Sequence, residues 1–260
     1  MRKLFLLAVL IYPLSSTLYA ETAQQKGLAI ATESENRDKG WHDQYAEMTM
    51  ILTNAQGEKS IREMRSKAFE MSTDGDKTLI IFDRPRDVRG TALLTWSHKV
   101  KSDEQWLFLP ALKRVKRISS KNKSGPFMGS EFAYEDLSSQ EIEKYNYEYQ
   151  RDEKFEGEDC FVVERDPVDE NSGYKRQLIW IDKSEYRPRK IVFYDRKNSL
   201  LKTLIFADYK KYLGHIWRPQ KMTMKNVQTN KGTILTWSTY KMNTGLKENS
   251  FTRNGLKRAK

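Results

Sequence analysis

Three histidines, His42, His98 and His215, are the residues of this chain best suited to acid–base catalysis or metal binding. They lie far apart in the sequence, and no HExxH motif places two of them on one helical face to hold zinc. The chain also has no GxSxG nucleophile elbow, no glycine-rich phosphate loop and no CxxC pair. We therefore expect no enzyme, no metal site and no cofactor, because catalysis would require distant residues such as these histidines to converge.

The acidic pairs and the single cysteine offer little further chemistry. Glu135 and Asp136 are adjacent, as are Glu158 and Asp159, and neighbouring residues on a strand face opposite sides. The two carboxyl groups of such a pair are therefore unsuited to act as acid and base at one centre. Cys160 has no partner for an internal disulfide, and the apolar residues that follow it predict a buried, unreactive thiol.

A glycine-hinged aromatic segment is the most informative part of the sequence. It follows one apolar strand and one basic strand, and it is too apolar for a solvated loop, although glycines and Pro126 interrupt it. Such a segment needs an apolar surface to lie on. We expect a movable lid over a hydrophobic cavity, with Gly125 and Gly129 as hinges. The expected lid residues are Gly125, Phe127, Met128, Gly129, Phe132 and Tyr134.

Methionine and aromatic residues of the predicted strands are the candidates for the cavity wall. Met48 and Met50 are two residues apart, as are Met222 and Met224, so each pair faces one side of its strand. Unbranched, polarizable side chains adapt to ligands of variable shape such as acyl chains, although they also serve as ordinary core fillers. The expected ligand-binding residues are Met48, Met50, Trp106, Phe108, Leu178, Trp180, Met222 and Met224.

The densest basic run of the chain consists of Lys113, Arg114, Lys116 and Arg117. Beside the mouth of a hydrophobic cavity, these side chains would be suited to the phosphate headgroups of an anionic membrane or to an acidic partner protein. A lysine-rich edge strand is also a common device against strand-to-strand aggregation. The sequence leaves both interpretations open, and one run can serve both purposes.

The hydrophobic pattern predicts many strands and few helices. An amphipathic helix is expected over residues 22–39, and a second helix is expected within residues 132–145. The basic C-terminal residues 253–260 are expected to fray. Strands are expected over residues 46–53, 61–71, 77–82, 91–96, 105–109, 113–118, 159–165, 174–181, 190–194, 200–209, 216–225 and 233–241.

Several of these strands are apolar on both faces. Trp106 and Phe108 face one way while Leu107 and Leu109 face the other. A sheet with one solvated face would show polar residues on that face. We therefore expect a mainly β fold, an incomplete and half-closed antiparallel β-barrel with a few helices covering its concave side. A plain β-sandwich fits less well, because it would expose large apolar residues.

The first 20 residues have the form of a secretory signal peptide. Arg2 and Lys3 precede an apolar run, and Glu21 stands where a lipoprotein would need a cysteine. We expect export by a cleavable signal and one soluble periplasmic domain, residues 21–260, that is not a lipoprotein. Removal of residues 1–20, which contain no acidic residue, lowers the net charge from +11 to +9. Export argues against nucleic acid as a partner of this basic chain and favours anionic lipid or acidic protein surfaces.

Three segments, residues 46–65, 76–94 and 105–137, resemble the outer-membrane lipoprotein-sorting family, the LolA/LolB-like proteins, in the branch associated with RND-type transporters. The third segment is the most specific, because an apolar strand, a basic strand and the sequence GPFMGS follow in that order. The resemblance implies an incomplete antiparallel β-barrel closed by helices, whose hydrophobic cavity accepts acyl chains or another lipid in transit across the periplasm. It implies no catalytic residue and no metal. The lid segment differs from that of the carriers, so another apolar molecule handled with a transporter is an equal candidate to lipoprotein.

We therefore expect a periplasmic carrier that binds an acyl chain, lipid or lipoprotein and moves it between envelope partners. The alternative is a periplasmic adaptor that carries nothing and docks, through its basic strand, on an RND-type transporter or another envelope complex. A tightly bound lipid would favour the carrier, whereas salt-sensitive binding of an empty protein to a transporter would favour the adaptor.

Overall fold

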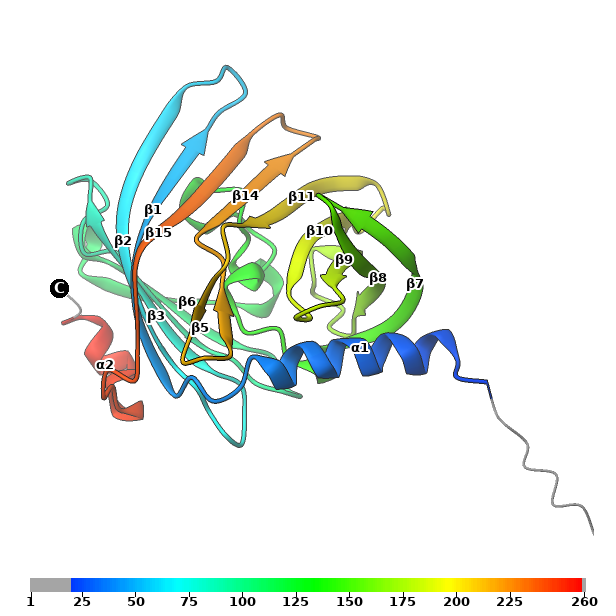
Figure 1. Cartoon of the computed structure of the whole chain (residues 1–260). Coiled ribbons are helices and arrows are strands. Elements are labelled where there is room, and N and C mark those ends of the chain that lie inside the picture. Colours follow the sequence, from blue (N-terminus) through cyan, green and yellow to red (C-terminus); the bar gives the residue numbers. More distant parts are fainter. Residues whose placement is uncertain (1–19, 259–260) are drawn as a thin grey trace, which may run out of the picture.

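The computed structural model describes residues 20–258. The expected signal peptide, residues 1–20, lies outside the described residues except for Ala20. Among the helices of the described part, none is both long enough and apolar enough to cross a bilayer. Strands make up most of the regular structure, and they form one strongly curved layer (Figure 1).

Thirteen strands of residues 20–258 form a single antiparallel sheet. In hydrogen-bonding order they are β6 (Arg114–Ile118), β5 (Glu104–Leu109), β4 (Ala92–Trp96), β3 (Lys77–Arg84), β2 (Lys59–Phe69), β1 (Asp43–Thr53), β15 (Gly232–Met242), β14 (Lys221–Asn226), β11 (Leu200–Ala207), β10 (Pro188–Asp195), β9 (Tyr174–Asp182), β8 (Glu158–Pro167) and β7 (Tyr145–Phe155). Two short strands, β12 (Lys210–Tyr212) and β13 (Ile216–Arg218), pair with each other. The terminal strands β6 and β7 do not pair with each other, so the sheet stays open. This confirms the expected half-closed antiparallel barrel.

Short turns join most neighbouring strands, as expected for an antiparallel sheet. In the turn between β1 and β2, the Asn54 side chain accepts hydrogen bonds from the backbone of Gln56 and Glu58 at 3.1 and 2.9 Å. Gly57 adopts a φ of +86° there, which glycine tolerates without steric cost. The pair β1 and β15 is different, because these strands come from opposite ends of the chain and yet pair in the middle of the sheet.

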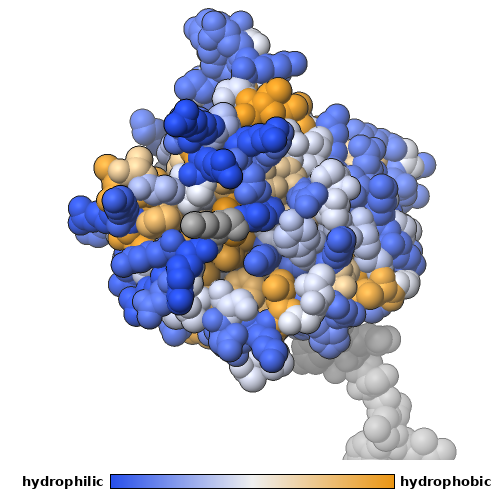
Figure 2. All heavy atoms as spheres, turned by 90° about the vertical axis from the view of Figure 1, so that its left-hand side faces the viewer, coloured by the Kyte–Doolittle hydropathy of each residue, from blue (hydrophilic) through white to orange (hydrophobic). Residues whose placement is uncertain are grey.

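Both faces of the sheet are covered, as its doubly apolar strands require. Met50 of β1 lies in the main core on the concave face. On the convex face Trp106 of β5 packs with Phe251 and Leu256 from the C-terminal segment, and α2 (Arg253–Leu256) lies on the outside of the sheet (Figure 1). Viewed from this side, the surface is mostly hydrophilic with separate apolar areas (Figure 2). The expectation that the C-terminal residues fray is wrong as far as residue 256, because Leu256 is fully buried.

Helix α1 (Ala23–Arg37) crosses one end of the sheet beside β7 (Figure 1). It begins with a capping box in which Thr22 and Gln25 exchange hydrogen bonds at 2.9 and 3.1 Å. Gly27 permits its close approach to the sheet, because a Cβ atom at this position would lie 2.7 Å from the backbone nitrogen of Tyr149. The buried side chain of Ile30 then joins the concave core. The helix expected over residues 22–39 is thereby confirmed.

Three local expectations are wrong. Residues 132–145 form no α-helix but contain the short 3-10 turns η4 (Tyr134–Leu137) and η5 (Ile142–Lys144), between which the backbone is extended. Strand β7 was not expected, although Tyr145, Tyr147 and Tyr149 alternate along it with the period of a strand. The single strand expected over residues 216–225 is divided into β13 and β14, because Pro219 between them has no backbone N–H to donate.

Candidate functional site

The glycine-hinged aromatic segment, residues 125–134, lies inside the curve of the sheet, and we call it the aromatic plug. It is a small hairpin, closed by hydrogen bonds from Phe127 N to Phe132 O at 2.7 Å and from Tyr134 N to Gly125 O at 3.1 Å. Phe127 is completely buried, and its ring centroid lies 5.6 Å from that of Phe82 in β3. The plug therefore belongs to the concave core of the protein.

A buried ion pair at Asp136, which accepts a hydrogen bond from Ala133 of the plug, ties the plug to the sheet. Lys202 Nζ of β11 donates to Asp136 Oδ2 at 2.7 Å and to Glu131 O at 2.8 Å, and both side chains of the ion pair are less than a tenth exposed. The Tyr174 hydroxyl donates to the second oxygen of Asp136 at 2.8 Å. Glu135 accepts two further hydrogen bonds from the loop before β9, and burial together with the adjacent Asp136 raises the pKa of Glu135. Buried polar groups on both sides of the contact are thus satisfied.

A cavity of about 840 Å³ occupies the other end of the concave side. Strand β11 connects the two ends of the concave side. Lys202 near the start of this strand contacts the plug, and Phe206 near its end lines the cavity. Helix α1, the loop after β2 and the β13 strand contribute to its rim. The apolar part of the wall consists of Ala31, Trp41, Met71, Ile142, Tyr147, Val163, Ile179, Ile181, Tyr186, Pro188, Ile191, Phe206, Tyr209, Trp217, Pro219 and Met222.

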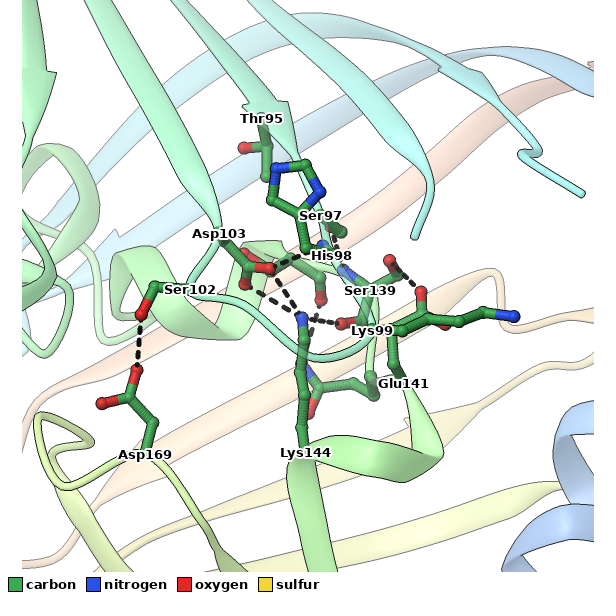
Figure 3. A network of polar contacts seen from close by, with 12 residues as sticks. Thr95, Ser97, His98, Lys99, Ser102, Asp103, Ser139, Glu141, Lys144 and Asp169 are labelled. Carbon is green, nitrogen blue, oxygen red and sulfur yellow. Dashed lines mark hydrogen bonds and ion pairs between the residues drawn. The ribbon is translucent and has the colours of Figure 1, made fainter. Parts of the chain in front are cut away.

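A polar network holds the segment Ser138–Ile142 against the cavity (Figure 3). Lys144 Nζ donates to Asp103 Oδ1 at 2.8 Å and to the carbonyl oxygen of Ser139 at 2.9 Å. Ser139 N donates in turn to Ser97 Oγ at 2.9 Å. Because these contacts join the loop after β4 to the loop before β7, they fix the position of Glu141 in the cavity wall.

Three carboxyl groups of the cavity wall, those of Glu70, Asp76 and Glu141, have no lysine, arginine or histidine nitrogen within 4.0 Å among residues 20–258. Burial, with smaller contributions from the nearby Glu141, Glu70 and Asp38, raises the pKa of Asp76 to about 7, although a hydrogen bond from Met71 N at 3.0 Å acts in the opposite direction. One side of the cavity therefore carries a negative potential, which is reduced because Asp76 is partly protonated in neutral water.

The eight residues expected to bind ligand fall into three groups. Met222 lines the cavity, while Met48, Met50 and Met224 face the same concave side but are buried in the packed core. The other four do not line the cavity, because they face the convex side of the sheet. Trp106 and Phe108 pack with the C-terminal segment, and Leu178 and Trp180 pack around Cys160.

The six expected lid residues also lie away from the cavity wall. Phe127 and Phe132 are in the main core, with Met128 and Tyr134 packed against it, and Gly125 and Gly129 lie in the same hairpin. In this structure the segment does not cover the cavity, because its aromatic side chains pack into the concave core beside it. Its role as a movable lid stays a prediction. Its apolar character, which the sequence made clear, is satisfied by the protein's own sheet.

The remaining residues singled out in the sequence are dispersed. Lys113, Arg114, Lys116 and Arg117 are all exposed at the edge strand β6, outside the cavity wall. His42 lies at the cavity rim, His98 is buried against Asp74 at 2.6 Å, and Nε2 of His215 lies 3.2 Å from the Lys39 carbonyl oxygen. Cys160 is buried as expected, and burial raises the pKa of its thiol to about 11.

Sequence reasoning missed most of the wall that surrounds the cavity. Ile179 and Ile181 alternate along β9 with Leu178 and Trp180, which were the residues expected to bind ligand. The strand was therefore identified correctly, but its opposite face lines the cavity. Arg165 also lines the cavity and is only 7 % exposed. A lone arginine two residues after the buried Val163, and hence on its face of the strand, is the signal that could have identified it.

Comparison with known proteins places the chain among relatives of the same fold. A family model described as an uncharacterized protein family matches residues 74–258. The crystal structure of a candidate outer membrane lipoprotein-sorting protein domain from Vibrio parahaemolyticus is 61% identical, covers 90% of this chain and 100% of its own, and has a TM-score of 0.89. A DUF1329 family protein from Desulfovibrio piger is 29% identical over 90% of this chain and 99% of its own, with a TM-score of 0.86.

A third solved structure extends the likeness in fold. A LolA superfamily protein from Nitrosomonas europaea is 22% identical, covers 90% of this chain and 99% of its own, and has a TM-score of 0.70. No curated protein matches the chain. The half-open antiparallel sheet, its covered concave face and the identity to the Vibrio domain agree with one another. The chain belongs to the outer-membrane lipoprotein-sorting protein family, and its fold is LolA-like.

Proposed function

We propose that this protein is a periplasmic carrier, which binds an acyl chain, lipid or lipoprotein in its cavity and moves it between envelope partners. The observation that carries the proposal is the cavity of about 840 Å³ beside an apolar wall on the concave face. This volume lies within the range of small-molecule sites, roughly 300–1,000 Å³. The name of the 61% identical Vibrio domain points in the same direction.

Burial of hydrocarbon supplies the binding free energy in this proposal. Each methylene group removed from water contributes about 0.8 kcal/mol, so a chain buried over a few methylenes outweighs a surface charge contact of about 1 kcal/mol. Ile179, Ile181 and Phe206 offer such a surface on neighbouring parts of the wall. The protein needs no catalytic group for this role.

The test is lipid extraction and native mass spectrometry of protein purified from its own envelope. Met222→Trp fills the cavity from β14 and is expected to reduce co-purifying lipid at least fivefold. Thr223→Trp is the matched control, because its side chain faces the convex side of the same strand and should leave the lipid content unchanged. Wild-type protein that is free of lipid, and that binds no alkyl-chain probe afterwards, would rule out the carrier.

A second candidate is an adaptor that carries nothing and docks on an RND-type transporter or an anionic membrane surface. It is favoured by the edge strand β6 and the residue before it, where the side chains of Lys113, Arg114, Lys116 and Arg117 are exposed. Of these four, Arg117 has a carboxylate partner within the described chain, Glu104 at 3.3 Å. Binding to a transporter domain or to anionic vesicles that weakens steeply between 50 and about 300 mM salt, and that is lost in Arg114→Glu/Lys116→Glu, would support the adaptor.

A further inference from the structure

Three polar side chains form a row across the concave face of β7, β8 and β9. Tyr147, Arg165 and Gln177 are direct partners in the register of these strands, so their side chains are neighbours on one face. They are 8 %, 7 % and 2 % exposed. Tyr147 and Arg165 line the cavity, and Val163, two residues before Arg165, lines it as well. The row thus places a positive charge in a mostly apolar wall.

The guanidinium group of Arg165 is held in a fixed orientation. Its Nε donates to Gln177 Oε1 at 2.8 Å, and its Nη2 donates to Gln140 Oε1 at 2.9 Å. The same amide oxygen of Gln140 accepts from the Tyr145 hydroxyl at 2.6 Å. The guanidinium carbon lies 4.2 Å from the centroid of the Tyr145 ring, so the group is stacked as well as hydrogen-bonded.

This buried cation lacks a counter-ion in the described chain. No carboxylate of residues 20–258 lies within 4.0 Å of Arg165, and Nη1 has no hydrogen-bond acceptor there. The buried Lys202, by contrast, is paired with Asp136 at 2.7 Å, and the partly buried Arg187 is paired with Asp182 at 2.8 Å. A charge with so little access to water and no counter-ion is costly, and the free Nη1 group of Arg165 is not fully enclosed, so that an anion in the cavity could reach it.

Tyr147 supplies a second unused donor beside Arg165. Its hydroxyl forms no hydrogen bond within residues 20–258, and its side chain faces the same cavity. A planar guanidinium offers parallel N–H groups that match the two oxygens of a carboxylate or a phosphate, and a phenol hydroxyl can donate to the same anion.

We propose that Arg165, with Tyr147, binds an anionic oxygen group, a carboxylate or a phosphate, at the polar end of the molecule carried in the cavity. This proposal rests on the carrier function proposed above and specifies the chemistry of its cargo. The alkyl chain lies along Ile179, Ile181 and Phe206 while the anion meets the guanidinium.

The acidic side of the same cavity offers the opposite chemistry. Glu70, Asp76 and Glu141 would attract an ammonium group rather than an anion. Two differences favour the anion site. Arg165 is permanently charged and fixed by three neighbours, whereas burial holds the pKa of Asp76 near 7, so that its carboxyl group is partly protonated in neutral water. A cationic probe is therefore part of the test.

The experiment compares four twelve-carbon probes, each below its micelle concentration, by displacement of a fluorescent apolar dye. They are dodecanoate, monododecyl phosphate, dodecanol and dodecylammonium. Wild-type protein is expected to bind at least one of the two anions tenfold or more tightly than dodecanol, and the tighter anion identifies the source as a free fatty acid or a phosphate-bearing lipid. Arg165→Met should abolish this preference without changing the affinity for dodecanol, and Arg165→Lys should retain part of it.

The controls separate this inference from the carrier function. Arg176→Met removes a guanidinium on the outer face of β9, which pairs with Glu164 at 3.0 Å, and should leave every affinity unchanged. Tyr147→Phe removes one hydroxyl with little disturbance of the core, so a threefold or greater loss for the anions alone supports the site even if Arg165→Met does not fold. Equal binding of anions and dodecanol, or tightest binding of dodecylammonium, overturns the anion site and leaves the carrier intact. Absence of binding by all four probes overturns both.

Discussion

The two ends of the concave side differ in what fills them. At one end the aromatic plug brings the fully buried Phe127 against Phe82, and the Lys202–Asp136 ion pair fixes it to the sheet. At the other end the same sheet encloses a cavity of about 840 Å³, although Phe206 and Ile181 are no less apolar. The difference shows that the curvature of the sheet creates more hollow than the strands fill. A segment of the chain supplies the missing apolar mass at one end only.

The largest expected effect is on the free energy of unfolding, when the same change, phenylalanine to alanine, is made at each end of the concave side. Phe127→Ala should lower the free energy of unfolding by about 5 kcal/mol, because the packed plug leaves a cavity that cannot collapse. Phe206→Ala should cost about 3 kcal/mol, because the side chain already faces open volume and loses fewer contacts. Urea denaturation of both variants measures the difference. Equal losses would contradict the contrast between a packed end and an open end.

The next effect concerns the ion pair of the plug. Lys202→Met should destabilise the protein by about 3 kcal/mol, because it leaves Asp136 buried with hydrogen bonds from Tyr174 and Ala133 but without a cation. Lys183→Met is the matched control. Lys183 pairs with Asp152 at 2.6 Å on the surface, where such a pair contributes about 0–1 kcal/mol. A Lys202→Met variant as stable as this control would show that the plug does not depend on its charge.

The smallest expected effect is the pH dependence that the open end imposes. The unfolded chain loses the Asp76 proton near pH 3.8, the ordinary pKa of an aspartate side chain, whereas the folded chain keeps it up to about pH 7. Between these values the folded state binds more protons, so the contribution of Asp76 to stability is present below pH 4 and is lost as the pH rises to 7. Asp76→Asn should therefore gain stability relative to wild type across this window, by about 1.4 kcal/mol for each pH unit.

Thermal melts of wild type and Asp76→Asn at unit steps from pH 4 to 8 measure this gain. Glu143→Gln serves as control, since Glu143 is exposed on the same segment as Glu141. If the melting temperatures of wild type and Asp76→Asn change in parallel with pH from 4 to 8, then Asp76 titrates normally and the cavity wall is well hydrated.

The sequence was sufficient for the architecture and insufficient for the inner wall. Strands that are apolar on both faces, such as the one with Trp106 and Leu107, predict a covered and curved sheet regardless of which face is inside. They cannot show which face lies inside the barrel, because neither face carries the polar residues that would mark it as the outer one. The pattern therefore allows Trp106 to be expected in the cavity wall, although the C-terminal segment with Phe251 covers it on the outside.

The aromatic plug illustrates a second limit. Its composition correctly predicted that residues 125–134 lie on an apolar surface, but composition does not distinguish a lid over a ligand from a filling of the core. The deciding contacts are made with Phe82, Lys202 and Thr233, which are distant in sequence. The cavity was missed for the same reason, because the elements that line it, α1, β8 and β13, are distant in sequence and meet only in the folded protein.

The pairing of β1 with β15 has a consequence for how the protein reaches its folded state. The first and last strands are centre-sheet neighbours, so the hydrogen-bonding groups of β1 that face β15 stay unsatisfied until nearly the whole polypeptide is present. Contacts between such remote segments form slowly, because a long loop must close before they are made. A growing chain would thus remain without this central strand pair until the final strand is present, and a truncation before residue 232 would expose the unpaired edge of β1 to aggregation.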